Sequence, residues 1–563
     1  MHYTGARILI EALIEQGVDT VFGYPGGAVL TIYDELFKHK DRIRHILVSH
    51  EQHAAHAADG YARSTGKTGV CIATSGPGAT NLVTGIATAA MDSVPLVAIT
   101  GNVSTALLGK DSFQEVDIAG ITMPVVKHNW IVKDVNELAE VIREAFLVAR
   151  TGRPGPVLVD IPKDIAGALS TACSTPNLAE RARRLEERSS RRAFSEEDIG
   201  KAASLLAGAK HPVLYAGGGV IISGASKELI ELAERLGAPV ALSLMGTGAI
   251  PKSHPLHTGL VGMHGTVASN KAVQQADLLV AVGARFSDRV TSSPGTFAGA
   301  AKILHFDIDP AEINKNIQAE TWVVGDIRKT LGKVLARLPP RAEAGWEGEI
   351  ARWKGCIPKS HEKTGGLRPR FILEETARRL GEDAVVATDV GQHQIWTAQF
   401  YPFTRPRSFL SSGGLGTMGF GLGAALGAKI ANPSRAVALF TGDGCFRMNC
   451  AEMGTLKAYG VPLLIVVFNN QALGMVRQWQ RLFYEERYSE TVLTQWPDFV
   501  KLAQAYGLSG YSADTEDGFA AALDRAAGDL KAGQAAVIDA AIDPDEEVLP
   551  MVPGGMPIDR QIL

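Results

Sequence analysis

Short apolar runs alternate with amphipathic helical stretches along most of this chain, and this alternation constrains its fold more than any other feature. Strand-length apolar runs separated by helical segments are typical of parallel α/β sheets. The first part of the chain has such runs at residues 18–24, 46–49, 69–74, 95–100 and 157–161. Later runs lie at 213–215, 278–282, 303–308, 384–388, 436–441, 463–468 and 536–541. We therefore predict an α/β protein of three doubly wound parallel-sheet domains.

Two polar stretches divide the three units. Residues 178–192, LAERARRLEERSSRR, are dense in charge and lack strand character, which is typical of a surface helix or a linker. A second polar stretch, which contains proline, extends from Pro339 to Pro369. The predicted domains are residues 1–175, 195–338 and 370–545, followed by a C-terminal tail at 546–563.

Composition narrows the class of function. Lys and Arg (56) nearly balance Asp and Glu (60) without long blocks of one sign, which argues against binding to nucleic acid or to an anionic membrane. The apolar runs are shorter than the ~20 residues of a membrane-spanning helix. The five cysteines are odd in number and form no CxxC pair, so neither a disulfide framework nor a zinc site is indicated. We expect a cytoplasmic protein that acts on a small molecule.

An acidic turn, Gly442-Asp443-Gly444, follows one predicted strand of the third unit. Twenty-four residues separate it from Asn469 and Asn470, a spacing that fits one helix and a returning strand. Since parallel strands end at the same edge of a sheet, Asp443 and Asn470 are expected to lie together beside a helix N-terminus, which favours an anion. A carboxylate and an amide oxygen suit Mg²⁺, with a backbone carbonyl and diphosphate oxygens as further ligands. We interpret the pattern as a magnesium diphosphate site; a pair of ligand-free tight turns is the alternative.

The first unit contains a weak echo of this pattern. Residues 74–78, Pro95-Leu96 and Asn102 match residues 440–444, Pro462-Leu463 and Asn469 at an offset of 366 or 367. In this alignment Pro77 occupies the position equivalent to Asp443, and Val103 occupies the position equivalent to Asn470. The two units are therefore candidate duplicated folds, of which only the C-terminal copy can hold a metal.

The spaced GDG and NN motifs resemble the cofactor signature of thiamine-diphosphate enzymes. Further segments resemble one branch of that superfamily, the acetohydroxyacid synthases or acetolactate synthases: residues 23–27 (GYPGG), 75–81 (SGPGATN), 113–115 (FQE), 160–163 (DIPK), 283–286 (GARF), 388–394 (TDVGQHQ) and 412–421 (SGGLGTMGFG). The similarity covers essentially the whole chain. It implies that the domains bind, in order, the pyrimidine of thiamine diphosphate, FAD, and the diphosphate with Mg²⁺.

The resemblance also implies an activity, that of a transferase in branched-chain amino acid biosynthesis. Such an enzyme decarboxylates pyruvate and transfers the hydroxyethyl carbanion to a second pyruvate, giving 2-acetolactate, or to 2-ketobutyrate, giving 2-aceto-2-hydroxybutyrate. Glu51 matches the glutamate that hydrogen-bonds the pyrimidine nitrogen N1′ and favours the imino tautomer, whose nitrogen removes the C2 proton. An isolated glutamate would be interpreted as a helix-start carboxylate.

Other residues receive roles only through this resemblance. Gln114 and Phe113 match the pocket of the reacting intermediate, and Met475 and Trp479 match the acceptor pocket, although core packing is the common fate of a tryptophan. Arg289 is the candidate cation for the substrate carboxylate; the alternative is that it is an ordinary surface arginine. Lys163 either acts on the same pocket or caps a strand end. The remaining thiamine diphosphate matches are Tyr24, Pro25, Gly26, Pro77, Val390, Gly391, Gln392, His393, Gly416, Met418, Gly444 and Cys445. The metal set is Asp443, Asn470 and the backbone carbonyl of Ala472.

The FAD matches lie mostly in the central unit. Gly217-Gly218-Gly219 after a predicted strand is a weak signal, because a glycine-rich turn often has no ligand. The resemblance implies a mainly structural flavin held by Arg153, Gly217, Gly218, Leu244, Gly283, Arg285, Asp307 and Asp326. Three residues depart from the family pattern: His53 replaces a glycine, Ser287 replaces the first Asp of an FDDR stretch, and Gly423 replaces a proline.

Rival interpretations remain within and outside this family. An FAD-independent catabolic acetolactate synthase would lack the full set of flavin matches, and a pyruvate oxidase or oxalyl-CoA decarboxylase would lack the combined 113–114 and 475–479 blocks. A non-catalytic paralogue would be expected to lose Glu51, Asp443 or Asn470, and all three are present. Because Glu51 and Asp443 lie in different domains, the family arrangement implies active sites at the interface of a homodimer, which can pair into a tetramer. A small regulatory subunit is also implied.

Overall fold

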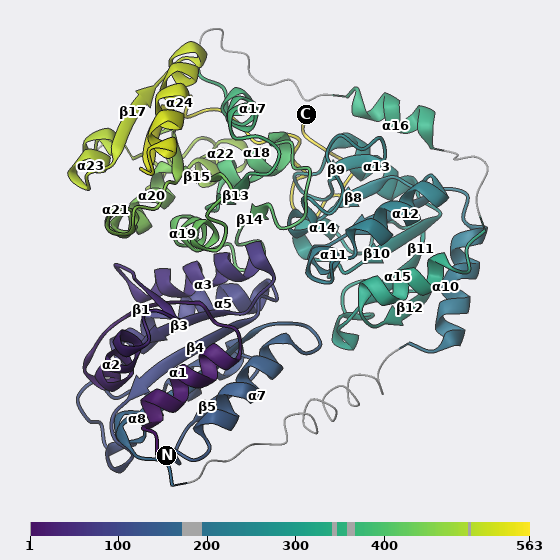
Figure 1. The fold of residues 1–563 in the computed structure, drawn as a ribbon. Coiled ribbons are helices and arrows are strands. Elements are labelled where there is room, and N and C mark those ends of the chain that lie inside the picture. Colours follow the sequence, from purple (N-terminus) through teal and green to yellow (C-terminus); the bar gives the residue numbers. More distant parts are fainter. Residues whose placement is uncertain (1, 172–193, 340–345, 357–365, 494–496) are drawn as a thin grey trace.

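The computed structural model describes residues 2–171, 194–339, 346–356, 366–493 and 497–563. It contains three sheets of six parallel strands with helices on both faces (Figure 1). This architecture confirms the predicted fold class. The charged segment 178–192, predicted as a surface helix or linker, lies outside the described residues.

The first sheet has the order β2-β1-β3-β4-β6-β5. Its strands are β1 (Thr20–Tyr24), β2 (Arg44–Leu47), β3 (Gly69–Ala73), β4 (Leu96–Asn102), β5 (Asn129–Ile131) and β6 (Pro156–Pro162). Apolar residues of α1 (Gly5–Glu15), α2 (Leu30–Lys38) and α7 (Leu138–Arg150) pack on one face. Helices α3 (Glu51–Thr65) and α5 (Val83–Met91) cover the other.

The third sheet repeats this strand order, β14-β13-β15-β16-β18-β17. Its strands are β13 (Val385–Thr388), β14 (Phe409–Leu410), β15 (Val437–Gly442), β16 (Leu464–Asn469), β17 (Ser509–Ala513) and β18 (Ala536–Ala541). Helices α17 (Pro369–Leu380), α18 (Gln392–Phe400) and α24 (Glu516–Lys531) lie on one face, and α19 (Gly421–Ala431), α21 (Met453–Tyr459) and α23 (Phe499–Ala505) lie on the other. The shared order agrees with the sequence echo between the two units.

The central sheet has a different order, β12-β11-β10-β7-β8-β9. It is built from β7 (Pro212–Ala216), β8 (Val240–Leu242), β9 (His257–Leu260), β10 (Leu278–Val282), β11 (Lys302–Asp307) and β12 (Thr321–Val324). Helices α10 (Glu196–Gly208), α12 (Ser226–Leu236) and α15 (Ile327–Leu335) cover one face. Trp346 and Trp353 at helix α16 (Glu347–Lys354), together with Ile558 of the C-terminal tail, complete the core on the other face. The tail thus returns from the third unit to the central one.

Helices α3 and α19 join the first and third units through one continuous apolar core. They approach closely because glycines stand at the crossing. A β-carbon at Gly60 would lie 2.1 Å from the Ala424 carbonyl oxygen, and one at Gly427 would lie 1.8 Å from the Ala57 carbonyl oxygen. This contact places the helix that begins at Glu51 against the helix that follows residues 411–420.

One local expectation was wrong. The segment between Gly444 and Asn469 was expected to contain one helix, but it contains α20 (Asp443–Asn449), a 3₁₀ turn at Cys450–Glu452 and α21. Within the polar stretch Pro339–Pro369, the described residues include α16, whose Trp353 is buried in the central core. This part of the stretch therefore packs on the central unit.

Candidate cofactor and active site

Asp443 stands at the carboxyl end of β15, as the first residue of α20, and faces the turn after β16. Its side chain is buried and its Oδ2 atom has no hydrogen-bond partner among the described residues. The backbone N–H groups of Gly444, Gln471 and Ala472 approach the carboxylate, yet burial outweighs them and raises the pKa of Asp443 to about 7. A buried acid with an open oxygen is the environment in which a bound cation replaces the missing partner.

The two asparagines of the NN motif point in different directions. Asn469 donates from Nδ2 to Asp539 Oδ1 of β18 over 2.9 Å, so its side chain ties two strands together. Asn470 Oδ1 accepts from the Ala472 N–H over 3.1 Å, and its Nδ2 donates to Gln392 Oε1 over 3.2 Å. Asn470 and Ala472 therefore lie beside Asp443 at the carboxyl end of β15 and β16, which we call the Asp443 edge. Asn469 instead ties β16 to β18 behind this edge.

Residues after β13 reach the same edge, because β13 is the neighbour of β15. Cys445 Sγ donates to the Val390 carbonyl over 3.1 Å. Gly391 has a φ of +154°, and a side chain there would meet the buried ring of His393. Burial lowers the pKa of His393 to about 3, so its ring is neutral. The structure thus gathers Val390, Gly391, Gln392, His393 and Cys445 around Asp443 and Gly444.

The loop before α19 supplies Gly416 and Met418. Gly416 has a φ of +71°, a backbone conformation that favours glycine. The Met418 methyl group lies 3.8 Å from the point that a β-carbon at Gly444 would occupy. Met418 consequently borders the first turn of α20.

Glu51 begins α3 at the corresponding edge of the first sheet. Its Oε2 accepts from Asn81 Nδ2 over 2.9 Å, and Oε1 lies 3.2 Å from the β-carbon position of Gly78. Pro77 opens the short helix α4 (Pro77–Asn81) that carries both neighbours. Tyr24 ends β1, the neighbour of β3, and Pro25 and Gly26 follow it; a β-carbon at Gly26 would lie within 2.6 Å of Thr74.

Gln114 lies against Gly76 beside this edge. A β-carbon at Gly76 would be 3.0 Å from the Gln114 Cα, and Gln114 itself has a φ of +58°. Glu115 holds the loop in this shape, since its carboxylate accepts from the N–H groups of Ser112 (2.8 Å), Lys110 (3.3 Å) and Gly109. Phe113, in contrast, is 87% exposed, so none of the described residues closes the pocket that it was predicted to form.

The remaining substrate candidates are spread over three units. Met475 and Trp479 lie on α22 (Gly474–Phe483), where Trp479 is half-buried and its ring nitrogen has no partner among the described residues. Lys163 opens α8 (Lys163–Gly167) after β6 and is exposed. The Arg289 side chain, on α14 (Asp288–Thr291) of the central unit, is 66% exposed, 4.0 Å from Asp288. No hydrogen bond or ion pair of the described residues links these four side chains to one another.

The predicted FAD residues follow neighbouring strands of the central sheet. Gly217, Leu244, Gly283 and Asp307 come at or after β7, β8, β10 and β11, and Asp326 comes after β12. The backbones approach closely, since a β-carbon at Gly217 would lie 2.1 Å from the Gly283 carbonyl oxygen. Arg153 reaches this edge from the first unit, 2.8 Å from Glu312 and 3.4 Å from Asp309. Gly218 follows β7, and Arg285 follows β10.

The three departures from the family pattern have local explanations. His53 is buried, and its Nδ1 lies 2.9 Å from Glu452 Oε1 of the third unit. A β-carbon at position 423 would lie 2.8 Å from His56 Cβ and 3.2 Å from the His53 carbonyl oxygen, so Gly423 leaves room for α3. Ser287 caps α14 by accepting the Arg289 N–H over 3.2 Å, a role that Asp and Ser perform equally well.

Sequence reasoning missed Asn81, Glu115, Gln478 and Glu452. Asn81 and Glu115 lie inside the SGPGATN and FQE motifs. The sequence does not show, however, that Asn81 bonds Glu51 or that Glu115 bonds the backbone of residues 109–112. Gln478 binds Gln392 over 3.0 Å across the third unit, a contact without any sequence signal.

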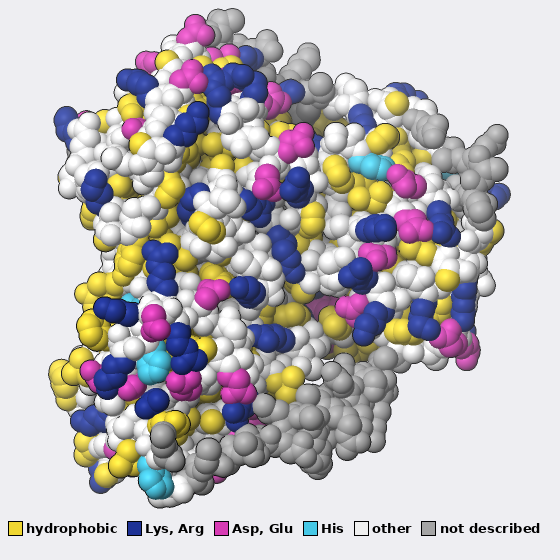
Figure 2. Space-filling view, in the orientation of Figure 1, with side chains coloured by type: hydrophobic (Ala, Val, Ile, Leu, Met, Phe, Trp, Pro, Cys, Tyr) yellow, Lys and Arg dark blue, Asp and Glu magenta, His cyan; other side chains and the backbone are white. Residues whose placement is uncertain are grey.

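The described residues contain no cluster of three or more His, Cys, Asp and Glu suited to a metal. No described helix is long and apolar enough to cross a membrane. Basic and acidic side chains are interspersed on the face shown in Figure 2.

Comparison with known proteins matches each unit to a thiamine pyrophosphate enzyme domain. The N-terminal TPP binding domain matches residues 3–121, the central domain 199–334 and the C-terminal TPP binding domain 389–540. The acetolactate synthase large subunit of Mycobacterium tuberculosis is 48% identical, covering 99% of this chain and 91% of its own length. The acetolactate synthase isozyme 2 large subunit of Escherichia coli K12 is 47% identical over 98% of both chains. The probable acetolactate synthase large subunit of Methanocaldococcus jannaschii is 47% identical over 98% of this chain and 94% of its own.

Proposed function

Since the chain belongs to the acetolactate synthase family of thiamine pyrophosphate enzymes, we propose that it decarboxylates pyruvate and joins the two-carbon fragment to a second 2-ketoacid. Pyruvate as acceptor gives 2-acetolactate, and 2-ketobutyrate gives 2-aceto-2-hydroxybutyrate. One observation carries the proposal: the buried, unpartnered Asp443 Oδ2 faces the 470–472 turn at the carboxyl edge of β15 and β16. The rest of the site is assembled around this point.

Asp443, Asn470 and the Ala472 carbonyl would hold Mg²⁺, and the metal would hold the diphosphate. The donors are oxygens, as Mg²⁺ requires, and the N-terminus of α20 points at the same place. When bound, thiamine diphosphate supplies the nucleophilic carbon and the electron sink for decarboxylation. The protein contributes the fixed geometry and the charge balance, because the cation neutralises Asp443 in an otherwise apolar setting.

Glu51 would hold a proton shared with the pyrimidine ring nitrogen. The Asn81 amide donates to Oε2, which leaves Oε1 as the free acceptor. The absence of a side chain at Gly78 keeps Oε1 accessible. Glu51 therefore has one oxygen fixed within its own unit and one available for proton transfer.

The substrate pocket would be formed by Gln114, Phe113, Met475 and Trp479, with Lys163 and Arg289 at its margin. The Glu115 carboxylate holds the loop in which Gln114 has a positive φ, so the backbone that carries Gln114 is fixed before substrate arrives. The Arg289 side chain is 66% exposed and its one ion pair among the described residues, with Asp288, is long at 4.0 Å, so a substrate carboxylate could compete for the guanidinium and bind it in a bidentate manner. Phe113, once covered by a second copy, and Trp479 would form an apolar wall that excludes water from the reacting atoms.

FAD is proposed at the carboxyl edge of the central sheet. The support is that the matched residues follow five neighbouring strands, β8, β7, β10, β11 and β12, where α/β sheets bind nucleotides. Arg153 adds a cation from the first unit. Because the reaction contains no redox step, the flavin would have a structural role.

We also propose a homodimer in which Glu51 of one copy serves the Asp443 site of the other; two dimers can pair into a tetramer. Glu51 bonds within its own unit, while Phe113 is 87% exposed and Tyr24 is 41% exposed beside it. Exposed aromatic residues at a catalytic edge favour cover by a second copy.

A mixing experiment tests the dimer. Glu51→Gln and Asp443→Asn are each expected to be inactive, but a hybrid dimer would contain one intact site and one doubly altered site. Random mixing after dissociation should therefore recover about a quarter of wild-type activity. Hybrid dimers that form without recovery would refute the shared site.

The relatives are named large subunits, so we propose a small regulatory subunit as a partner, to be tested by co-purification from the native source. A cytoplasmic location belongs to the same proposal, supported by the free thiols of Cys71, Cys356, Cys445 and Cys450.

The activity itself is tested by product analysis. Purified protein is incubated with pyruvate, thiamine diphosphate, Mg²⁺ and FAD, and acetolactate, acetaldehyde and acetyl phosphate are measured. Acetolactate as the main product is expected. Acetyl phosphate with oxygen uptake would indicate an oxidase, and full activity in protein that binds no flavin would favour a catabolic synthase.

A further inference from the structure

The loop at residues 411–419, which joins β14 to α19, is unusually rich in glycine for a segment that carries Gly416 and Met418. Gly416 and Gly419 both have positive φ values, and Gly413 and Gly414 precede them. Glycine adds conformational freedom, so such a loop needs external contacts to adopt one shape. The structure supplies these contacts largely from the first unit.

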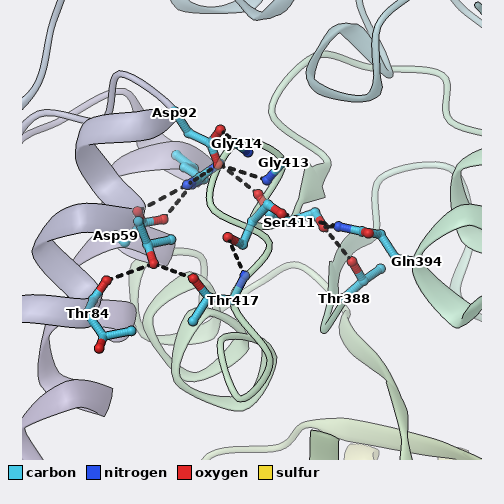
Figure 3. Close-up of polar contacts among 12 residues, drawn as sticks. Asp59, Thr84, Asp92, Thr388, Gln394, Ser411, Gly413, Gly414 and Thr417 are labelled. Atoms are coloured by element: carbon cyan, nitrogen blue, oxygen red, sulfur yellow. Dashed lines mark hydrogen bonds and ion pairs between the residues drawn. The ribbon is translucent and has the colours of Figure 1, made fainter. Parts of the chain in front are cut away.

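Asp92, which follows α5, holds the loop by its backbone (Figure 3). Its Oδ2 accepts the Gly413 N–H over 2.9 Å, and its Oδ1 accepts the Gly414 N–H over 2.8 Å. Asp92 is buried, so both bonds are shielded from water. One carboxylate thereby orients two successive peptides of the loop.

Arg63 of α3 fixes Asp92 in turn. Its Nη2 donates to Asp92 Oδ2 over 3.0 Å, and its Nη1 donates to the Ser411 carbonyl over 2.9 Å. Asp59, one helical turn earlier, pairs with the same guanidinium through Nε and Nη2, and no hydrogen bond or ion pair among the described residues joins it to the loop. The three charged side chains are almost completely buried.

Each of the three units makes a further contact with the loop. Thr88 of the first unit lies with its hydroxyl 2.7 Å from that of Thr417, and Gln394 of the third unit donates to Ser411 Oγ over 2.6 Å. A β-carbon at Gly413 would lie 2.3 Å from Met245 Sδ of the central unit, next to Leu244. Residues of all three units therefore contact the loop, and a side chain at position 413 would require Met245 to move.

We propose that Asp92 is a positioning residue for cofactor binding: it sets the 411–419 loop, and through it Gly416 and Met418, against the Asp443 edge. The inference rests on the proposed function, because it assumes that these two residues contact thiamine diphosphate. Asp92, a carboxylate of the first unit outside every cofactor motif, thereby controls the affinity of the third unit for the cofactor. The charge of Asp92 matters through the loop backbone and not through contact with the cofactor.

The test compares Asp92→Asn with Asp59→Asn. In either orientation, the amide at position 92 places an NH₂ group against Arg63 and Gly413 or against Gly414, so at least one loop bond is lost. Asp59→Asn makes the same charge change beside the same arginine and leaves both loop bonds. Thiamine diphosphate binding is measured by titration calorimetry with Mg²⁺ present, alongside the unfolding temperature and the KM for pyruvate.

We expect Asp92→Asn to raise the dissociation constant for thiamine diphosphate about tenfold or more, and Asp59→Asn to change it less than threefold. Both variants should lower the unfolding temperature, since both disturb the buried arginine. The KM for pyruvate should change little in either. Equal cofactor affinities in the two variants would overturn the proposal.

Thr88→Val provides a second test if Asp92→Asn does not fold. It preserves shape and removes the hydroxyl contacts with Thr417 and with the Thr84 carbonyl of the same helix, but leaves the Asp92 and Arg63 contacts in place. We therefore expect a smaller drop in unfolding temperature than in Asp92→Asn and about fivefold weaker cofactor binding. Unaltered binding in Thr88→Val would contradict the proposal. Wild-type protein that binds no thiamine diphosphate would instead refute the proposed function.

Discussion

The crossing of α3 and α19 leads to a sharp prediction about stability. The two helices meet at backbone distance, since a β-carbon at Gly427 would lie 1.8 Å from the Ala57 carbonyl oxygen. In Gly427→Ala the helices must separate by roughly 2 Å to reach ordinary van der Waals contact. Separation would open the core shared by the first and third sheets.

The change in the free energy of unfolding caused by Gly427→Ala is the sum of two opposing effects. Alanine gains about 1 kcal/mol over glycine in a helix interior. Overpacking a well-packed contact costs about 3 kcal/mol, and here the obstacle is a backbone carbonyl that cannot rotate away. We therefore expect a net loss of about 2 kcal/mol or more in the free energy of unfolding.

Gly528→Ala is the matched control. Gly528 also lies in a helix interior, in α24, but a β-carbon there would meet nothing within 4 Å. This variant should gain up to about 1 kcal/mol. Urea denaturation followed by circular dichroism gives both midpoints, and a Gly427→Ala midpoint equal to or above that of Gly528→Ala would refute the close packing of α3 and α19.

Three further predictions concern the site. Asn81→Ala removes the donor to Glu51 and should lower kcat about tenfold without a matching loss of cofactor binding; an unchanged kcat would show that Glu51 needs no support. Glu115→Gln should lower kcat severalfold by loosening the Gln114 loop. Because the backbone N–H groups lower the pKa of Glu115, these contacts are present above the ordinary carboxyl pKa and are lost as the pH falls through the lowered value, so the wild-type and variant kcat should converge in acid. Ser287→Ala should destabilise α14 by about 1 kcal/mol and Ser287→Asp should not, and the comparison of FAD affinities in the two variants then measures whether this cap supports the flavin.

Much of the sheet architecture was predictable because central strands of parallel sheets are continuous apolar runs. Leu278–Val282 and Ala536–Ala541 were predicted with the bounds that the structure has. Asn129–Ile131, Phe409–Leu410 and Ser509–Ala513 were not, because each lies at or next to the edge of a sheet and needs no apolar residues on both faces. The short strand Val240–Leu242 carries too few residues to distinguish it from a buried turn.

The candidate site was predictable where motif and strand end coincide, as at Asp443, Asn470 and Glu51. Contacts between distant segments carried no such signal. Asp92 is an ordinary acid after a helix in the sequence, and only the folded chain brings it to Gly413 and Gly414. The same holds for Glu452, which reaches Ser49 and His53 across the domain contact.

The most direct measurement is acetolactate formation from pyruvate by the wild type and by Glu51→Gln, with thiamine diphosphate, Mg²⁺ and FAD in excess. Loss of a positioned proton donor should lower kcat by about 100-fold or more. Thiamine diphosphate should still bind to the variant within a few-fold of wild type, because Asp443 and Asn470 are intact. Full turnover in Glu51→Gln would contradict the assignment of Glu51 and Asp443 to one thiamine diphosphate site.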